Sequence, residues 1–280
     1  MIGMTIKLLM CGNDRVFCGM LLTVLSITEY NKDKIDLYIG TMDLTATDER
    51  YRPITESHAS VLRGILRRAN PASTVRIVDF TASFCRELAD SKNLGSAYTP
   101  YAMIRLFAEE IEGIGDKLLY LDTDVMANGN IRELYSINVD DYHVAGARDY
   151  FGKFFFSPRY LNSGVLLINM KRMKEDGVFK KCRVLCRERK MLLFDQHAIN
   201  KYAKKKLILS RRYNEQKRTD KNTLLRHFAM TIKWLPYFHT ETVKPWQPDL
   251  VHKKLNDHTF DKIFERYERI VAALDAAQSP

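Results

Sequence analysis

The chain has 280 residues, of which 46% are hydrophobic and 28% are charged. This size and balance are typical of a folded domain with a sizeable core and argue against intrinsic disorder. No apolar run approaches the ~20 residues that a membrane-spanning helix needs. The first apolar run is short and is followed at once by Asn13, Asp14 and Arg15, so we expect no secretory signal and a cytoplasmic protein.

The formal net charge of +10 predicts a surface that attracts anions such as nucleic acids, anionic lipids or phosphorylated small molecules. The densest basic stretch is "KYAKKKLILSRRYNEQKRTDK", residues 201–221. It lacks the interleaved aromatic residues with which proteins stack on bases, and we expect no nucleic-acid partner. We interpret it as a solvated surface loop, with peripheral contact to a membrane surface as the alternative.

Five cysteines are scattered along the chain without the spacing of a metal site or a redox pair. In an intracellular protein such a set is typical of free thiols. The five are Cys11, Cys18, Cys85, Cys182 and Cys186.

Strand-like and helix-like segments alternate along the first 122 residues. The strand-like runs are almost entirely apolar, which predicts a mostly parallel sheet with helices on both faces. Ligands bind such sheets beyond the carboxyl ends of the strands, so residues 12–15 and 122–124 should border one crevice. The expected strands cover residues 6–12, 35–40, 75–80 and 117–122, and the expected helices cover residues 19–30, 59–69, 84–90 and 101–111.

After residue 130 the pattern is looser. We expect two strands over residues 143–149 and 162–170, an aromatic loop between them, a charged helix near residues 171–190 and a short helix over residues 194–200. Residues 260–277 form an amphipathic helix that we expect to pack on the domain, with a partner or membrane role as the alternative. Its apolar stripe consists of Phe260, Ile263, Phe264, Tyr267, Ile270, Val271 and Leu274.

Two aspartates, Asp122 and Asp124, end the apolar run in "LLYLDTDVMANGN". Residues two apart at a strand end project to the same side, so both carboxylates should face one point. Hard divalent cations require such an arrangement, and without a cation the mutual repulsion would raise a pKa. A divalent ion there can bridge to a diphosphate and stabilise a leaving group. From the spacing alone, two surface carboxylates that cap the next helix remain the alternative.

The longer stretch "LLYLDTDVMANGNIRELY" resembles the D-x-D region of family 8 glycosyltransferases, which are retaining enzymes. Further pieces follow in that family's order over about residues 5 to 250. They are "CGNDRVF", "YTPYAMIRL", "LNSGVLLINM", "DQHAIN", and "RHF" with "KPW". The resemblance implies an α/β fold of the GT-A type, with a mostly parallel, Rossmann-like sheet, over residues 1–255. Residues 256–280 would be a C-terminal helix packed on that domain.

The activity implied by the resemblance is transfer of a hexose, glucose or galactose, from a UDP-sugar to a saccharide or lipid-linked acceptor. Asp122 and Asp124 would ligate Mn²⁺ or Mg²⁺, with His227 as the third ligand. His239 is the alternative, because it lies nearer to Lys244 along the chain. A mixed carboxylate and imidazole set suits Mn²⁺ better than Ca²⁺. Lys244, from "KPW", would pair with the diphosphate as a point charge.

The resemblance also implies which residues bind the donor. The family's uridine-contacting loop corresponds to residues 11–14, where its usual aspartate is Asn13, and its usual tyrosine is Val16. Stacking of uracil on that tyrosine is therefore not expected here. The donor-side residues implied by the resemblance are Cys11, Gly12, Asn13, Asp14, Arg105, Asp122, Thr123, Asp124, Asp149, Asn162, Ser163, Gly164 and Lys244.

Asp195 and Gln196 occupy the family's catalytic positions. Asp195 would read donor hydroxyls, and Gln196 would lie on the sugar face opposite the leaving group. An amide is a poor nucleophile, so we favour front-face transfer, in which Gln196 stabilises an oxocarbenium-like state. His197 stands where the family has a second aspartate.

Two other classes of function remain as alternatives. "LLYLDTDV" also resembles the nucleophile strand of haloacid-dehalogenase-type phosphatases, in which the first aspartate attacks phosphorus. A catalytically dead module that only binds a UDP-sugar is the second alternative.

Overall fold

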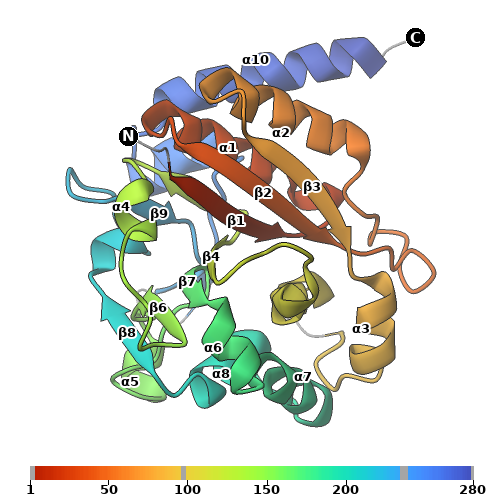
Figure 1. Cartoon of the computed structure of the whole chain (residues 1–280). Helices are drawn as coiled ribbons and strands as arrows, with labels where there is room; N and C mark the ends of the chain where they lie inside the picture. The colour runs from red at the N-terminus through yellow and green to blue at the C-terminus, as the bar shows by residue number, and fades with distance from the viewer. Residues whose placement is uncertain (1–3, 96–98, 234–238, 279–280) are drawn as a thin grey trace.

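The structure is a computed structural model that describes residues 4–95, 99–233 and 239–278 (Figure 1). Within these ranges, seven strands form one sheet in the order β3-β2-β1-β4-β7-β6-β8. The strands β3, β2, β1 and β4 are parallel, β7 is antiparallel to both neighbours, and β8 is parallel to β6. The expectation of a mostly parallel α/β sheet is therefore confirmed. The bounds are β1 Thr5–Cys11, β2 Lys34–Thr41, β3 Thr74–Asp79, β4 Lys117–Leu121, β6 Val144–Ala147, β7 Val165–Asn169 and β8 Lys206–Leu209.

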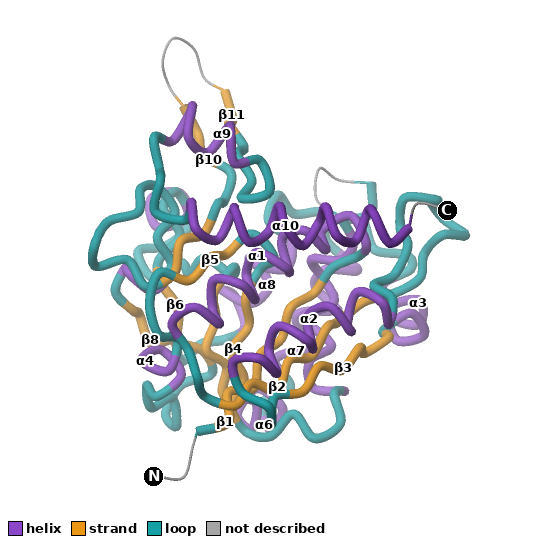
Figure 2. Tube along the Cα trace, turned by 90° about the horizontal axis from the view of Figure 1, so that it is seen from above, coloured by secondary structure: helices purple, strands orange, loops and turns teal. Residues whose placement is uncertain are grey.

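Helices cover both faces of the sheet, and alternate residues of β1 show why its sequence is apolar throughout. Leu8 is buried in the cluster that includes residues of α1, α2 and α10, whereas Leu9 is buried in the cluster on the opposite face. A strand that is buried on both faces is apolar at nearly every position, because neither set of alternate side chains faces water. One layer holds α1 (Phe17–Tyr30), α2 (Glu56–Ala69) and α10 (Asp261–Gln278), and the other holds α3 (Thr81–Leu88), η2 (Pro100–Glu110), α7 (Val178–Glu188) and α8 (Phe194–Tyr202) (Figures 1 and 2).

Three expected elements differ in detail. The helix expected over residues 101–111 is a 3₁₀ helix, η2. The charged helix expected near residues 171–190 is two helices, α6 (Met170–Glu175) and α7, because Gly177 has a φ of +58° in the left-handed region that ends helices. The aromatic segment 150–160 contains a short helix, α5 (Gly152–Phe155).

The basic segment 201–221 is solvated, as we expected, at most of its lysines and arginines, but it is not simply a loop. It forms the edge strand β8 and the 3₁₀ turn η3 (Arg211–Tyr213), and Asn214, Glu215 and Gln216 are buried. The prediction missed these buried residues because polar side chains can be buried when they are hydrogen-bonded, which composition does not reveal.

Two short strands, β5 (Val125–Ala127) and β9 (Leu225–His227), pair antiparallel, with Val125 opposite His227. They are about a hundred residues apart in sequence, and the pair joins the D-x-D turn to the last third of the chain. The hairpin strands β10 (Thr231–Lys233) and β11 (His239–Glu241) follow. The remaining elements are η1 Asp14–Val16, α4 Arg132–Tyr135, α9 Pro248–Leu250 and η4 Val251–Leu255.

The last helix, α10, lies against α1 (Figure 2). Phe260, Ile263, Phe264 and Tyr267 of its apolar stripe are buried in the core, and Ile270, Val271 and Leu274 pack against that core at its edge. In the described part of the chain, none of the helices combines the length and the apolar character needed to cross a bilayer.

Candidate active site

Asp122 and Asp124 lie in the short turn between β4 and β5 and converge on His227. The β5–β9 pairing places the His227 ring beside this turn. Its Nε2 lies 3.2 Å from Oδ1 of Asp124 and 3.8 Å from Oδ2 of Asp122. Ligand atoms of all three residues lie within 4.8 Å of one another. Of the two histidines that we considered, the structure brings His227 to the aspartates; the side chain of His239 lies outside the described residues.

The Asp124 carboxylate is buried and forms an ion pair with the Lys244 ammonium. Lys244 Nζ donates to Asp124 Oδ2 at 2.5 Å and to the Phe228 carbonyl at 3.3 Å. Burial by itself would raise the pKa of Asp124, but the Lys244 ammonium outweighs it and holds that pKa well below its usual range. The Asp124 carboxylate is therefore ionised at neutral pH.

Asp122 is oriented from the opposite side by Arg105 and Tyr120. Arg105 Nη2 donates to Asp122 Oδ1 at 2.8 Å, and the Tyr120 hydroxyl donates to the same oxygen at 2.6 Å. The Arg105 guanidinium also donates to the carbonyls of Ser163 and Ala102 and lies 4.2 Å from the centre of the Tyr120 ring. Arg105 is 6% exposed, so it is a buried part of the site and not a surface arginine. Because the Arg105 guanidinium binds Oδ1 of Asp122, the other carboxylate oxygen, Oδ2, faces His227.

A chain of hydrogen bonds determines which nitrogen of His227 faces the aspartates. Asp149 Oδ2 accepts from Asn162 Nδ2 at 2.9 Å, so Asn162 Oδ1 accepts from Asn214 Nδ2, also at 2.9 Å. Asn214 Oδ1 is then the acceptor for His227 Nδ1–H, at 3.1 Å. In the neutral ring the lone pair is therefore on Nε2, the nitrogen that lies beside the two aspartates and that can bind a metal ion. Our sequence analysis missed Asn214 because nothing in its local sequence links it to a histidine thirteen residues later.

Gly164 lies directly beneath the His227 ring. A Cβ at position 164 would lie 2.1 Å from Cε1 and 2.8 Å from Nε2 of His227. The Gly164 carbonyl also accepts from the Asp122 N–H at 2.8 Å. The glycine therefore allows the imidazole and the aspartate turn to approach the β7 end of the sheet together.

Asp195 and Gln196 begin helix α8 at the same end of the sheet. Gln196 Oε1 accepts from the Ser163 N–H at 2.9 Å and from the Ser163 hydroxyl at 3.2 Å, and its Nε2 lies 3.4 Å from Asp149 Oδ2. Asp195 Oδ2 lies 3.2 Å from Arg105 Nε, a contact of opposite charges that lacks hydrogen-bond alignment. Burial raises the pKa of Asp195 more than Arg105 lowers it.

The loop after β1 borders the aspartate turn, as its place in the sheet predicts. A Cβ on Gly12 would lie 2.3 Å from Val16 Cγ2 and 3.7 Å from Thr123 Cγ2. Asn13 is buried and its Nδ2 donates to the Arg50 carbonyl at 3.0 Å, whereas one carboxylate oxygen of Asp14 is buried without a partner. Cys11 is buried, which raises the pKa of its thiol to about 12.

The donor set fits a divalent cation. Two carboxylates and a neutral imidazole nitrogen are the ligand types of Mn²⁺ and Mg²⁺ sites, and the imidazole favours Mn²⁺. The hydrogen bond from His227 Nδ1–H to Asn214 is the kind of outer contact that orients metal-binding histidines. His227 is 4% exposed and Asp124 is 8% exposed, so an ion at this point would be shielded from bulk water.

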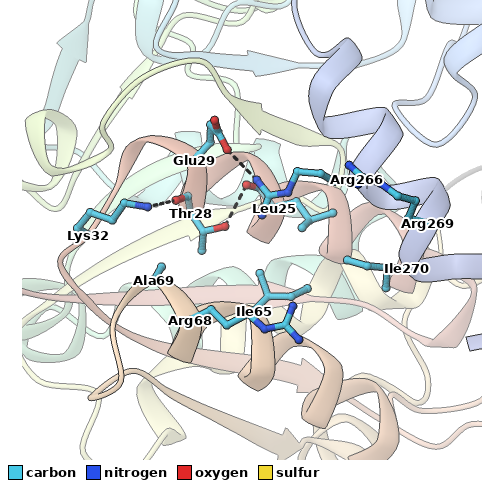
Figure 3. Close-up of a pocket in the computed structure, with 10 residues that line it drawn as sticks. All are labelled: Leu25, Thr28, Glu29, Lys32, Ile65, Arg68, Ala69, Arg266, Arg269 and Ile270. Atoms are coloured by element: carbon cyan, nitrogen blue, oxygen red, sulfur yellow. Dashed lines mark hydrogen bonds and ion pairs between the residues drawn. The ribbon is translucent and has the colours of Figure 1, made fainter. Parts of the chain in front are cut away.

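A hollow of about 520 Å³ lies elsewhere, between α1, α2 and α10 (Figure 3). Local structure accounts for its basic lining. Lys32 Nζ donates to the Thr28 carbonyl at 2.9 Å near the carboxyl end of α1, and Arg266 forms an ion pair with Glu29 at 2.7 Å. Arg68 lies in the last turn of α2, where a cation complements the helix dipole. We therefore assign this hollow no part in the site.

The family model described as glycosyl transferase family 8 matches residues 7–249. The chain belongs to glycosyl transferase family 8. This comparison gives no support to the phosphatase or the binding-module alternative.

Two curated relatives of this family 8 chain come from Streptococcus pneumoniae serotype 4. Glycosyltransferase GlyF is 26% identical over 195 residues, which cover 69% of this chain and 44% of GlyF. Glycosyltransferase GlyA is 36% identical over 66 residues, which cover 24% of this chain and 10% of GlyA. The chain thus spans less than half the length of these two relatives.

Solved structures of similar fold include a galactosyltransferase, LgtC, in complex with donor and acceptor sugar analogues. It superposes with a TM-score of 0.68 at 18% identity, over 95% of this chain and 96% of LgtC. Glycosyltransferase GlyE of Streptococcus pneumoniae superposes with a TM-score of 0.63 at 18% identity, over 95% of this chain and 64% of GlyE. These similarities show that the family 8 chain has the GT-A type of fold.

Proposed function

We propose that this family 8 chain is a metal-dependent retaining hexosyltransferase that moves glucose or galactose from a UDP-sugar to a saccharide or lipid-linked acceptor. The observation that carries the proposal is the convergence of Asp122, Asp124 and His227 Nε2, with the Lys244 ammonium on the same Asp124 carboxylate. A cation site beside a second positive charge is what a nucleotide diphosphate requires. The sugar analogues bound to LgtC support the donor class by analogy.

The cation held by Asp122, Asp124 and His227 would be Mn²⁺ or Mg²⁺. When bound, it would supply the Lewis acidity that stabilises the charge on a departing diphosphate. Lys244 would add a mobile positive charge for the same diphosphate, and Arg105 would hold the Asp122 carboxylate in its orientation.

The proposed transfer occurs on one face of the sugar. The bond from the anomeric carbon to the β-phosphate oxygen of UDP breaks, the bond to the acceptor oxygen forms on the same face, and the acceptor proton passes to the departing phosphate oxygen. The Gln196 amide is held by Ser163 through its Oε1, and its carbonyl dipole would stabilise the oxocarbenium-like state. An amide held by two donors is poorly suited to act as a nucleophile.

The hydroxyl groups of the donor sugar would be bound by polar side chains around this centre. The Asp195 carboxylate lies against Arg105, and Asp149 and Asn162 form one hydrogen-bonded pair next to Gln196. Ser163 and Gly164 would border the sugar, and Cys11, Gly12, Asn13, Asp14 and Thr123 would border the nucleotide.

We further propose that residues 1–255 are the catalytic domain and residues 256–280 its packed C-terminal helix. We place the protein in the cytoplasm, with peripheral contact to the inner face of the membrane. The net charge of +10 supports contact with anionic lipids.

A donor screen tests the proposal. UDP-, GDP- and CMP-sugars are incubated with the protein and Mn²⁺, Mg²⁺ or EDTA, and nucleotide release is measured. We expect release from UDP-glucose or UDP-galactose with Mn²⁺, abolition by EDTA, and a loss of at least about 100-fold in Asp124→Asn, equivalent to ~2.7 kcal/mol. Retention is read from the anomeric proton signal of the product.

The exposed carboxylate of Asp141 offers a matched control, and Asp141→Asn should keep full activity. Unchanged turnover in Asp124→Asn would refute the metal-dependent mechanism. Tight UDP binding in calorimetry without turnover would favour the binding module, and phosphate release from an aryl phosphate would favour the phosphatase.

A further inference from the structure

A second hollow, of about 360 Å³, adjoins the candidate active site. We call it the basic hollow. One short segment connects the basic hollow to the candidate metal ligands. Asn214 is hydrogen-bonded to the His227 ring, and Gln216, two residues later, lines the hollow. Two residues of chain span at most ~7 Å, so the two places are neighbours. Its lining residues are Arg148, Tyr150, Lys153, Ile208, Leu209, Ser210, Arg211, Glu215, Gln216 and Lys217.

The charge of the basic hollow is strongly positive and uncompensated. Its single carboxylate, Glu215, is already occupied, because Arg211 pairs with one oxygen and the Lys217 and Arg218 N–H groups donate to the other at 2.7 and 3.2 Å. Arg148, Lys153 and Lys217 have no carboxylate within ion-pair distance in the described part of the chain. Three clustered cations without a counter-charge repel one another, and an anionic ligand would relieve that repulsion.

The walls of the basic hollow are built rigidly. Lys217 Nζ lies 3.5 Å and Lys153 Nζ lies 5.0 Å from the centre of the Tyr150 ring, so this ring holds both ammonium groups. The buried Gln216 side chain accepts from the Tyr150 N–H at 3.0 Å and donates to the Arg148 carbonyl at 3.1 Å. Arg148 and Tyr150 are the sequence neighbours of Asp149, whose carboxylate is part of the hydrogen-bond network of the candidate active site.

An exposed apolar edge follows directly in sequence. Phe154, Phe155 and Phe156 on and beside α5 are 73%, 66% and 48% exposed. Lys153 Nζ lies 4.8 Å from the Phe154 ring, and the Phe156 ring packs against His197, the residue after Gln196. Three adjacent exposed phenylalanines are unusual on a soluble surface and mark a contact with an apolar partner. In Figure 1, α5 and β8 lie at the same end of the molecule.

We propose that the basic hollow and this apolar edge bind the acceptor, and that the acceptor is a sugar joined through phosphate to a lipid chain. The inference rests on the proposed function. The donor's phosphates belong beside Asp124 and Lys244, and its hexose is neutral, so a second set of cations calls for an anion on the other substrate. Arg148, Lys153 and Lys217 hold the phosphate, and Phe154 and Phe155 contact the start of the lipid chain.

Binding of small probes to the full chain tests this assignment without turnover. Inorganic phosphate, n-octyl phosphate and n-octyl glucoside are titrated by calorimetry below their micelle concentrations. We expect n-octyl phosphate to bind most tightly. Arg148→Gln and Lys217→Gln should each weaken it by about fivefold, the effect of one partly exposed charge contact. Phe155→Ser should weaken n-octyl phosphate and leave inorganic phosphate unchanged, which separates a lipid phosphate from a free one.

Arg68→Gln, which removes one exposed arginine in the other hollow, is the matched charge control and should bind n-octyl phosphate like the wild type. UDP with Mn²⁺ is titrated in parallel and should bind all variants equally. The proposal is overturned if the Arg148 and Lys217 variants bind n-octyl phosphate normally, or if Arg68→Gln weakens its binding as much. Failure of UDP to bind would instead count against the proposed function.

Discussion

The Cα of Gly164 supports the His227 ring: a Cβ at position 164 would lie 2.1 Å from His227 Cε1 and 2.6 Å from Nδ1. A glycine in the turn just before β7 thereby sets the position of an imidazole in β9, sixty-three residues later. The contact matters because Nε2 of the same ring lies beside the carboxylates of Asp122 and Asp124.

Replacement of Gly164 by alanine tests that contact. The new methyl group must displace the His227 ring, since real Cβ atoms do not approach other atoms so closely. We expect Gly164→Ala to lower Mn²⁺ affinity by about 10- to 100-fold, as loss of ligand orientation does. Overpacking should also cost about 1–3 kcal/mol of stability. Calorimetric Mn²⁺ titration measures the affinity. Gly64→Ala, at a helical glycine with open space around it, is the control, and equal Mn²⁺ affinity in both variants would contradict the expectation.

Asn214 should matter for metal binding although it provides no metal ligand. Its Oδ1 is the acceptor for His227 Nδ1–H, so Asn214→Ala frees the ring to rotate and to change tautomer. We expect Mn²⁺ affinity to fall by about 10- to 100-fold, with UDP binding in the absence of metal unchanged. Asn222→Ala, at an exposed asparagine nearby, should bind Mn²⁺ normally. A wild-type affinity in Asn214→Ala would show that the ring is held by packing alone.

Arg105 cannot be replaced by lysine, although the charge is preserved. The guanidinium donates to Asp122 and to the carbonyls of Ala102 and Ser163 at the same time, and one ammonium group cannot span these directions. We expect Arg105→Lys to lose about 1–3 kcal/mol in the free energy of urea unfolding. The exposed Arg67→Lys should change that free energy by less than about 0.5 kcal/mol. A similar small change in Arg105→Lys would mean that the buried network does not need the guanidinium fork.

The thiols should differ in reactivity according to burial. Burial raises the pKa of Cys11 to about 12, and burial also raises the pKa of Cys182 and Cys186. Because only the thiolate reacts, iodoacetamide at pH 8 should label exposed Cys85 in the native protein and reach the three buried thiols only after unfolding. Mass spectrometry of the digested protein measures each site. Rapid native labelling of Cys11 would mean that the loop after β1 opens in solution.

Much of the fold follows from local patterns in the sequence. The apolar runs of β1, β2, β3 and β4 predicted a parallel sheet because strands buried on both faces carry no polar alternation. The split of the charged helix at Gly177 and the buried polar residues of segment 214–216 were not predictable in the same way. A left-handed glycine and a fully hydrogen-bonded polar cluster leave no periodic signal.

Local patterns in the sequence were enough to predict the parallel sheet, the two carboxylates at the end of β4 and the resemblance to a family. The contact of His227 with those carboxylates became visible in the folded chain, because it depends on the pairing of β5 with β9 across about a hundred residues. The structure also revealed Asn214 and the orientation of the ring. Hydrogen-bond direction passes from Asp149 through two amides to the imidazole, and such a relay exists only once the chain has folded.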